Sequence, residues 1–137
     1  TAGSGSWLGY NFSHQRIVFA GLKDKKRVGL CLDTAHAYLA GYDISKKEGL
    51  DALLGEIEQE VGLKHLKLIH LNDAVGKLGS HHDRHEHIGK GGIGLAGMRA
   101  IINHRKLKNL PFILETPKFG PKEDQLNLRT VRRLRKG

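Results

Sequence analysis

The sequence has few cysteines, prolines and aromatic residues, and its shortages exclude several classes of protein. The single cysteine, Cys31, excludes an internal disulfide framework of the kind found in small secreted domains. No apolar run approaches the length of a membrane span, so no membrane partner is expected. No signal peptide is visible, which makes a reducing cytoplasmic setting the default. The first residue is Thr1 rather than methionine, so a targeting segment for a nucleus or mitochondrion could precede it.

Positive charge is abundant by comparison. The chain of 137 residues has 23 Lys and Arg against 14 Asp and Glu, which gives a formal net charge of +9. Such an excess favours a polyanionic partner, most simply nucleic acid. A basic surface that only serves solubility explains the charge equally well. The length permits one domain with one hydrophobic core.

One stretch, from Leu68 to Gly94, concentrates side chains that can bind metal or transfer protons. They are His70, Asp73, His81, His82, Asp83, His85, Glu86 and His87. Asp83 and His85 are two residues apart, so in an extended segment they point the same way while Arg84 faces away. The set combines imidazole and carboxylate without thiolate, which suits zinc, manganese or iron.

Apolar runs and helical periodicity alternate along the chain. Apolar residues at helical spacing predict helices at residues 12–22, 46–61, 94–103 and 123–135. Continuous apolar runs, typical of parallel strands covered on both faces, predict strands at residues 28–32, 66–71 and 111–116. The segment after His36 is predicted to be a loop or short helical turn. Cys31 is expected to be a buried core thiol.

The predicted strands deliver acidic or imidazole groups at or near their carboxyl ends. Asp33 and His36 follow the first strand, His70 lies in the second, and Glu115 in the third. Alternating strands and helices require a parallel sheet with right-handed crossovers. In a parallel α/β barrel, catalytic residues lie at this carboxyl end, but three strands do not close a barrel of eight.

These motifs resemble a known family. GLCLDTAHAYLAGYD, HLND, GS followed by DRH, IGKGGIG and ILET are similar to motifs of the endonuclease IV family, the zinc-dependent apurinic/apyrimidinic endonucleases of DNA base-excision repair. The resemblance covers nearly the whole chain. It implies that residues 1–137 are a single partial domain, the C-terminal part of a TIM (β/α)8 barrel with about three parallel strands and flanking helices. The N-terminal half of the barrel would then be a partner that completes the fold.

The resemblance also implies a cluster of three zinc ions in the complete fold. His36, Asp83 and His85 would hold one ion, and this set is complete here. Asp33, His70 and Glu115 would hold a second, together with a glutamate expected just upstream of Thr1. The third ion would take that glutamate and two histidines of the absent half. About one full zinc site is therefore expected in this chain.

The implied activity is that of a deoxyribonuclease IV. It would hydrolyse the phosphodiester 5′ to an abasic site in double-stranded DNA and leave a 3′-hydroxyl. Zinc ions would acidify a water and neutralise charge on the phosphate, and Glu115 would orient or deprotonate that water. The chain by itself is expected to be inactive or nearly so.

Two loops, residues 74–80 and 89–94, are expected to line the DNA groove, because glycine permits close approach of backbone to phosphate. Glycines that serve only tight turns are an equally good explanation at Gly91, Gly92 and Gly94. Val75 stands where the family commonly has a basic residue, which weakens one expected phosphate contact. The predicted DNA-binding residues are Asn72, Lys77, Gly79, Ser80, Arg84, Gly89 and Gly91.

Two other interpretations remain open. A sugar isomerase or epimerase of similar barrel fold also uses Glu, Asp and His around a divalent metal. A non-catalytic fragment that binds metal or DNA weakly is the other alternative. The DRH motif and the long histidine-rich loop favour the nuclease, since a third metal has no obvious use in isomerisation.

Overall fold

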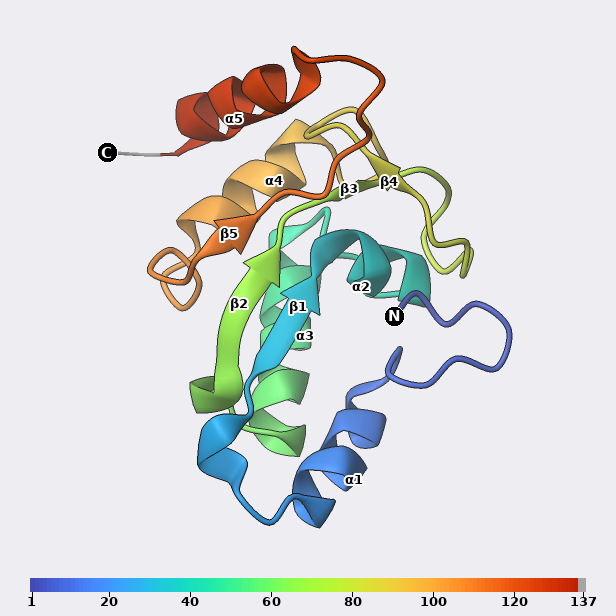
Figure 1. Ribbon diagram of the computed structural model, residues 1–137, viewed down its shortest axis with the longest axis vertical. Coiled ribbons are helices and arrows are strands. Elements are labelled where there is room, and N and C mark those ends of the chain that lie inside the picture. The colour runs from blue at the N-terminus through green and yellow to red at the C-terminus, as the bar shows by residue number, and fades with distance from the viewer. Residues whose placement is uncertain (136–137) are drawn as a thin grey trace.

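A computed structural model describes residues 1–135, which fold around a three-stranded parallel sheet (Figure 1). The strands β1 (Leu30–Asp33), β2 (Leu66–His70) and β5 (Phe112–Ile113) lie in the order β1-β2-β5. The helices between and around them are α1 (Phe12–Gly21), α2 (Thr34–Ala40), α3 (Lys47–Glu60), α4 (Gly94–Asn103) and α5 (Glu123–Leu134). Parallel strands joined by helices are the arrangement of a partial barrel, as predicted.

The register of the sheet aligns the strand ends that carry polar groups. Asp33 at the end of β1 pairs with His70 at the end of β2, and His70 in turn pairs with Ile113 of β5. All three strands point the same way, toward the loops drawn around α2 and β3 in Figure 1. The alignment places the candidate ligands of different strands at one edge of the sheet.

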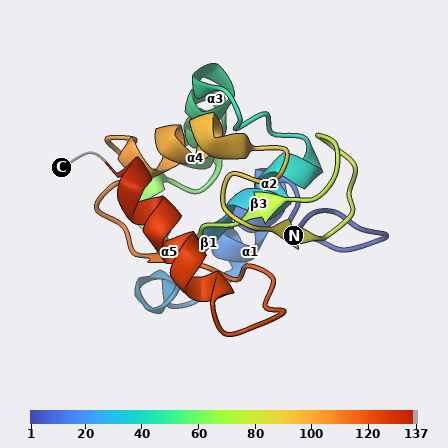
Figure 2. The same cartoon turned by 90° about the horizontal axis from the view of Figure 1, so that it is seen from above.

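One face of the sheet is built into the hydrophobic core. Leu32 of β1 and Ile69 of β2 are buried, and they belong to one cluster with the apolar stripes of α3 and α4. Figures 1 and 2 show α3 behind the sheet, with α4 on the same side. Full burial of each such aliphatic side chain stabilises the fold by about 1.5–3 kcal/mol. The buried residues of these helices are Leu50, Leu53, Leu54, Ile57, Met98, Ile101 and Ile102.

The opposite face of the sheet is open within residues 1–135. Cys31 is exposed, Ile113 retains 47% of its accessible surface, and Leu68 is half-buried. The prediction of a buried core thiol at Cys31 is therefore wrong. Alternation along a strand sends successive side chains to opposite faces, and here the described residues supply a core for only one of them. In a closed barrel this second face would be the interior.

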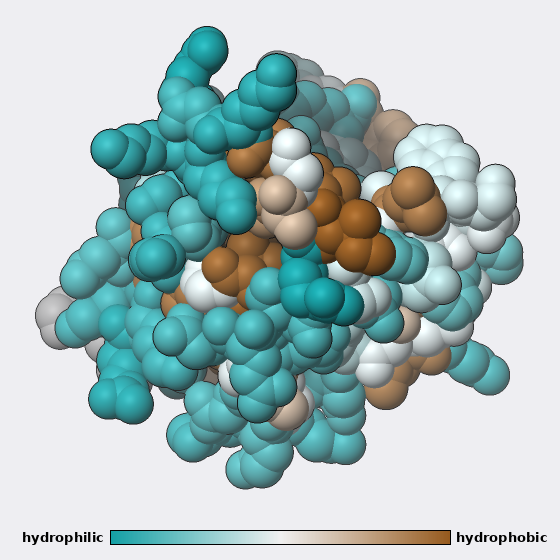
Figure 3. All heavy atoms as spheres, turned by 90° about the horizontal axis from the view of Figure 1, so that it is seen from below, coloured by the Kyte–Doolittle hydropathy of each residue, from teal (hydrophilic) through white to brown (hydrophobic). Residues whose placement is uncertain are grey.

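The underside of the molecule, at the amino ends of the strands, has a different surface. Figure 3 shows it as mostly hydrophilic, with apolar side chains exposed between the hydrophilic groups. The 3₁₀ turns η1 (Lys25–Arg27) and η2 (Leu63–His65) lie at this end. Ile17 and Val18 of α1 are more than half exposed, so α1 is only partly covered by the described residues.

Three local features differ from the sequence-based expectations. Helix α2 begins directly after Asp33 and already includes His36, whereas a loop or short helical turn was expected only after His36. The third strand is regular only over Phe112–Ile113, whereas a strand over residues 111–116 was predicted. A short antiparallel pair, β3 (Asp73–Ala74) and β4 (His85–Glu86), was not predicted. In the part of the chain that the structure describes, no helix combines the length and apolar character needed to cross a bilayer.

Candidate metal centre

The first group of ligands comes from the carboxyl ends of the parallel strands, and we call it the strand-end group: Asp33, His70 and Glu115. His70 Nδ1 lies 2.9 Å from Glu115 Oε2 and 3.7 Å from Asp33 Oδ2. One ligand atom from each of the three residues lies within 4.8 Å of the others. This spacing suits a single cation between an imidazole and two carboxylates.

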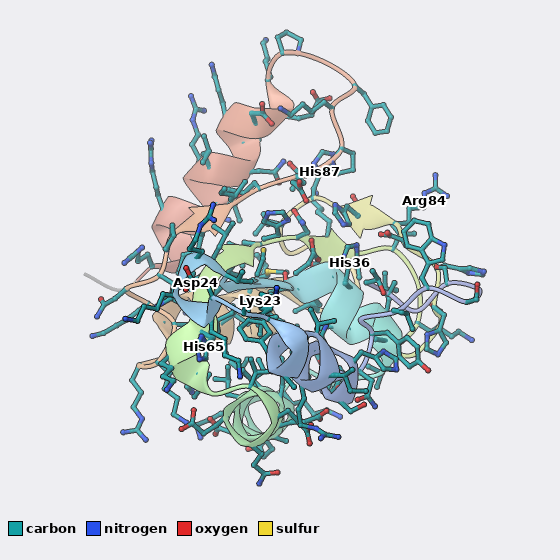
Figure 4. The ribbon with its side chains drawn as sticks, turned by 60° about the horizontal axis from the view of Figure 1, so that its bottom comes forward. Lys23, Asp24, His36, His65, Arg84 and His87 are labelled. Carbon is teal, nitrogen blue, oxygen red and sulfur yellow. The ribbon has the colours of Figure 1, made fainter. Side chains whose placement is uncertain are left out.

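The second group, which we call the hairpin group, consists of His36, Asp83 and His85. His36 Nε2 lies 3.0 Å from Asp83 Oδ1, and His85 Nε2 lies 3.8 Å from the same oxygen. The β3–β4 pair brings His85 to this position by pairing it with Ala74, next to the end of β2. Arg84 is exposed and lies at the periphery of the molecule, away from His36 (Figure 4).

Asp33 connects the two groups. Its Oδ2 atom lies 3.7 Å from His70 Nδ1 and 3.7 Å from His85 Nε2. The side chain is largely buried, and its Oδ1 accepts a 3.0 Å hydrogen bond from the backbone N–H of His36 at the start of α2. Helix capping therefore fixes one oxygen of the carboxylate. The other oxygen faces the imidazoles of both groups.

The ring nitrogens of His85 show why this residue suits a metal. Its Nδ1 lies 3.0 Å from the carbonyl oxygen of Glu115, so Nδ1 carries the proton and donates it. In the tautomer with the proton on Nδ1, the lone pair is on Nε2. In the described part of the chain, Nε2 is buried without a hydrogen-bond partner. A buried nitrogen lone pair that faces two carboxylates and a histidine fits a divalent cation.

Asn72 differs from its expected role. The side chain has no exposed surface, so the assignment of Asn72 to DNA binding is corrected. Its Nδ2 donates to Asp33 Oδ2 at 2.9 Å, and its Oδ1 accepts from the backbone N–H of Glu115 at 2.8 Å. Both polar ends of the amide are thus occupied inside the protein.

Asp73 also has an internal role rather than one as ligand or acid. It is completely buried, and its carboxylate accepts backbone hydrogen bonds of 2.9–3.1 Å from Gly91, Ile93 and Gly94. It therefore holds the glycine-rich loop against β3 and the start of α4. A Cβ atom at Gly91 would lie 2.4 Å from the carbonyl oxygen of Ala74, so close packing requires this glycine.

The other predicted DNA-binding residues lie around the carboxyl end of the sheet. Lys77 and Arg84 are exposed, whereas Gly79, Ser80, Gly89 and Gly91 are half-buried. Gly79 and Gly89 have φ angles of +70° and +78°, which is the left-handed region that glycine adopts without strain. Backbone geometry is a sufficient reason for glycine at these two positions.

Sequence reasoning missed Asn127, a buried residue of α5. Its Oδ1 accepts from the N–H of Ile88 at 2.9 Å, and its Nδ2 donates to Thr116 Oγ1 at 3.0 Å. The amide thus joins the segment after β4 to the segment after Glu115. The available signal was an asparagine at helical spacing from the apolar residues Val131 and Leu134, which pack against the core.

Comparison with known proteins gives a consistent set of matches. The sequence profile of the family described as xylose isomerase-like TIM barrel matches residues 1–136. The chain is 48% identical over 127 residues to a probable endonuclease 4 of Halothermothrix orenii, covering 93% of this chain and 46% of that protein. It is 46% identical over 134 residues to a probable endonuclease 4 of Methanoculleus marisnigri, covering 98% and 48%. The chain spans about half the length of these curated relatives.

A solved structure matches as well. The crystal structure of endonuclease IV from Thermus thermophilus superposes with a TM-score of 0.85 at 40% sequence identity. The match covers 98% of this chain and 47% of that one. The arrangement of strands and helices described above is thus shared with half of that structure.

Proposed function

We propose that this chain, which belongs to the xylose isomerase-like TIM barrel family, carries half of the active site of a zinc-dependent endonuclease of DNA repair. The reaction would be hydrolysis of the phosphodiester 5′ to an abasic site, leaving a 3′-hydroxyl. Relatives bearing the name endonuclease 4 support the nuclease class. The activity would belong to the assembled barrel, because three strands do not enclose a site.

The convergence of the two ligand groups carries this proposal. Residues far apart in the sequence meet at one end of the sheet, and Asp33 Oδ2 lies within 3.7 Å of histidines from both groups. The buried lone pair of His85 would be unfavourable without a partner, and a cation removes that cost. Imidazole and carboxylate ligands without thiolate suit zinc, and manganese or iron less specifically.

Bound zinc would supply positive charge for the scissile phosphate and the leaving oxygen. His36, Asp83 and His85 would hold one ion, and Asp33, His70 and Glu115 would contribute to another. Two ions so close together would share the charge of Asp33. We infer about one complete site in the chain by itself.

Glu115 has the best position for a catalytic base. Its side chain is 49% exposed, so its carboxylate can reach water as well as His70. Its backbone is fixed on both sides, because its N–H donates to Asn72 and its carbonyl accepts from His85. A carboxylate held in this way can accept a proton from an attacking water while the ligands keep their places.

DNA would lie across the carboxyl end of the sheet. Lys77 and Arg84 are exposed on the loops at this end and can pair with phosphates. The half-buried segments at Gly79, Ser80, Gly89 and Gly91 would contribute backbone contacts. Lys77 and Arg84 would hold the DNA phosphates beside the metal centre, and their positive charge would not repel its carboxylate ligands.

The test uses the 137-residue chain, with zinc content and incision of a duplex carrying one abasic site as readouts. We expect about one tightly bound zinc and no incision, with incision appearing when the other half of the barrel is added from a relative. His36→Ala should lose the zinc, whereas His82→Ala should keep it, because His82 is an exposed histidine outside both groups. Absence of zinc from the wild-type chain, or incision that survives chelation, would contradict the proposal.

A further inference from the structure

We propose that Asn72 is a positioning residue, whose buried amide sets the distance between two ligands of the metal centre. The inference rests on the proposed metal-dependent function and adds a residue that would touch neither metal nor DNA. It concerns Asp33, the last residue of β1, and Glu115, which follows β5; these two strands are not neighbours in the sheet. Asn72 follows β2, the strand between them.

The amide bridges the sheet at the level of the ligands. Asn72 Nδ2 donates to Asp33 Oδ2 at 2.9 Å on one side. On the other side, Asn72 Oδ1 accepts from the N–H of Glu115 at 2.8 Å. A side chain just after the central strand thus ties the end of β1 to the segment after β5, through an amide that carries its donor and its acceptor on separate atoms.

The orientation of the amide is fixed by its partners. A flip would place Nδ2 against an N–H group and Oδ1 against a carboxylate, which exchanges two hydrogen bonds for two repulsions. The backbone of Asn72 is also held, because Thr34 Oγ1 donates to its carbonyl at 2.6 Å and accepts from its N–H at 2.9 Å. Both Asn72 and Thr34 are fully buried, so water does not replace these bonds.

Removal of the amide would affect the ligands directly. Asp33 Oδ2 faces His70 and His85, and Asn72 Nδ2 donates to the same oxygen. Without that donor the carboxylate can rotate about its capped Oδ1, and Glu115 loses the bond that fixes its backbone. Partners of this kind typically change metal affinity by about 10- to 100-fold.

The experiment compares zinc affinity by chelator competition in the wild-type chain, Asn72→Ala and Asn127→Ala. Asn127 is the matched control, because it is a buried asparagine whose amide bonds to Ile88, Thr116, His87 and Glu123, and none of these belongs to the strand-end or hairpin group. We expect Asn72→Ala to weaken zinc binding by about 10- to 100-fold, and Asn127→Ala by less than about threefold. Equal losses in both variants, or none in Asn72→Ala, would overturn the inference.

A second measurement needs no variant of Asn72. The chain has asparagine at positions 11, 72, 103, 109 and 127, so selective ¹⁵N labelling gives few side-chain amide signals. Added zinc should shift the Asn72 amide and leave that of Asn127 in place; an unmoved Asn72 signal in zinc-bound protein rejects the positioning role. Incision is a separate readout. If the completed barrel binds zinc and depends on Asn72 for its affinity but does not cut DNA, the proposed nuclease function is wrong and the positioning role of Asn72 stands.

Discussion

The strand-end group and the hairpin group offer the same kinds of ligand on very different supports. Asp33 is 7% exposed and is held at both oxygens by a helix N-terminus and a buried amide. Asp83 is 42% exposed and precedes a strand of only two residues. His70 ends a strand of five residues, whereas His85 lies in the short β3–β4 pair.

The difference decides whether the ligands are ordered before the cation binds or become ordered when it binds. Backbone hydrogen bonds of the sheet fix the spacing of the ligands at the strand ends, so this site is preorganised before the cation binds. Ligands on an exposed segment lose conformational freedom when the cation binds, and that entropy reduces the affinity. Asp33 of the strand-end group also faces His85 of the hairpin group, so the two groups are coupled, and the loss of Asp33 should affect both.

The largest expected effect comes from the most exposed member of the strand-end group. With the barrel completed by a relative's other half, Glu115→Gln should lower kcat by about 10²- to 10⁴-fold, because an amide cannot accept the proton of the water. Binding of DNA should change little. Glu86→Gln is the control, since Glu86 lies in the β3–β4 pair outside both groups. Rates near wild type in Glu115→Gln would remove Glu115 from the catalytic role.

A smaller effect tests the asymmetry between the two groups. Asp33→Ala should lower zinc affinity by more than about 100-fold, because it removes the oxygen that faces histidines of both groups. Asp83→Ala should lower it by only about tenfold, since His36, His85 and Asp33 still converge. Calorimetric titration of each apo variant with zinc measures both losses. Equal losses would show that the exposed loop is as well ordered as the sheet.

Much of the fold could be predicted from periodicity. The helices at α1, α3, α4 and α5 begin and end within one residue of their predicted bounds, because each has an apolar stripe at helical spacing. The exposure of Cys31 could not be predicted in that way. A continuous apolar run indicates a strand buried on both faces, but the described residues cover only one face of β1.

The sequence predicted the ligand residues of the candidate site, but not the buried residues that hold those ligands in place. The spacing of Asp83 and His85 and the position of Asp33, His70 and Glu115 at strand ends indicated that they would converge, as the distances show. The roles of Asn72 and Asp73 could not be read from the motif HLND. Their side chains bond to residues far away in the sequence, and only the folded chain shows which polar group is buried.

The smallest expected effect concerns a histidine–carboxylate contact outside the centre. His104 Nε2 lies 3.0 Å from Asp51 Oδ1, and Lys47 Nζ lies 2.8 Å from Asp51 Oδ2, between α3 and α4. This pair resembles the contact of His36 with Asp83, but among residues 1–135 no third metal-binding side chain joins it. Asp51→Asn should therefore leave zinc affinity unchanged.

The same variant should change stability slightly and in a pH-dependent way. Lys47 first, and His104 second, lower the pKa of Asp51 below its ordinary value. A carboxylate with a depressed folded-state pKa stabilises the fold above its unfolded pKa of about 3.9, and this contribution is lost as pH falls through the folded pKa. Thermal unfolding of wild type and Asp51→Asn should thus differ slightly near pH 7 and converge at about pH 2. A zinc-dependent difference between them would mean that a histidine and one carboxylate suffice, and that the convergence of three ligands does not distinguish the metal centre.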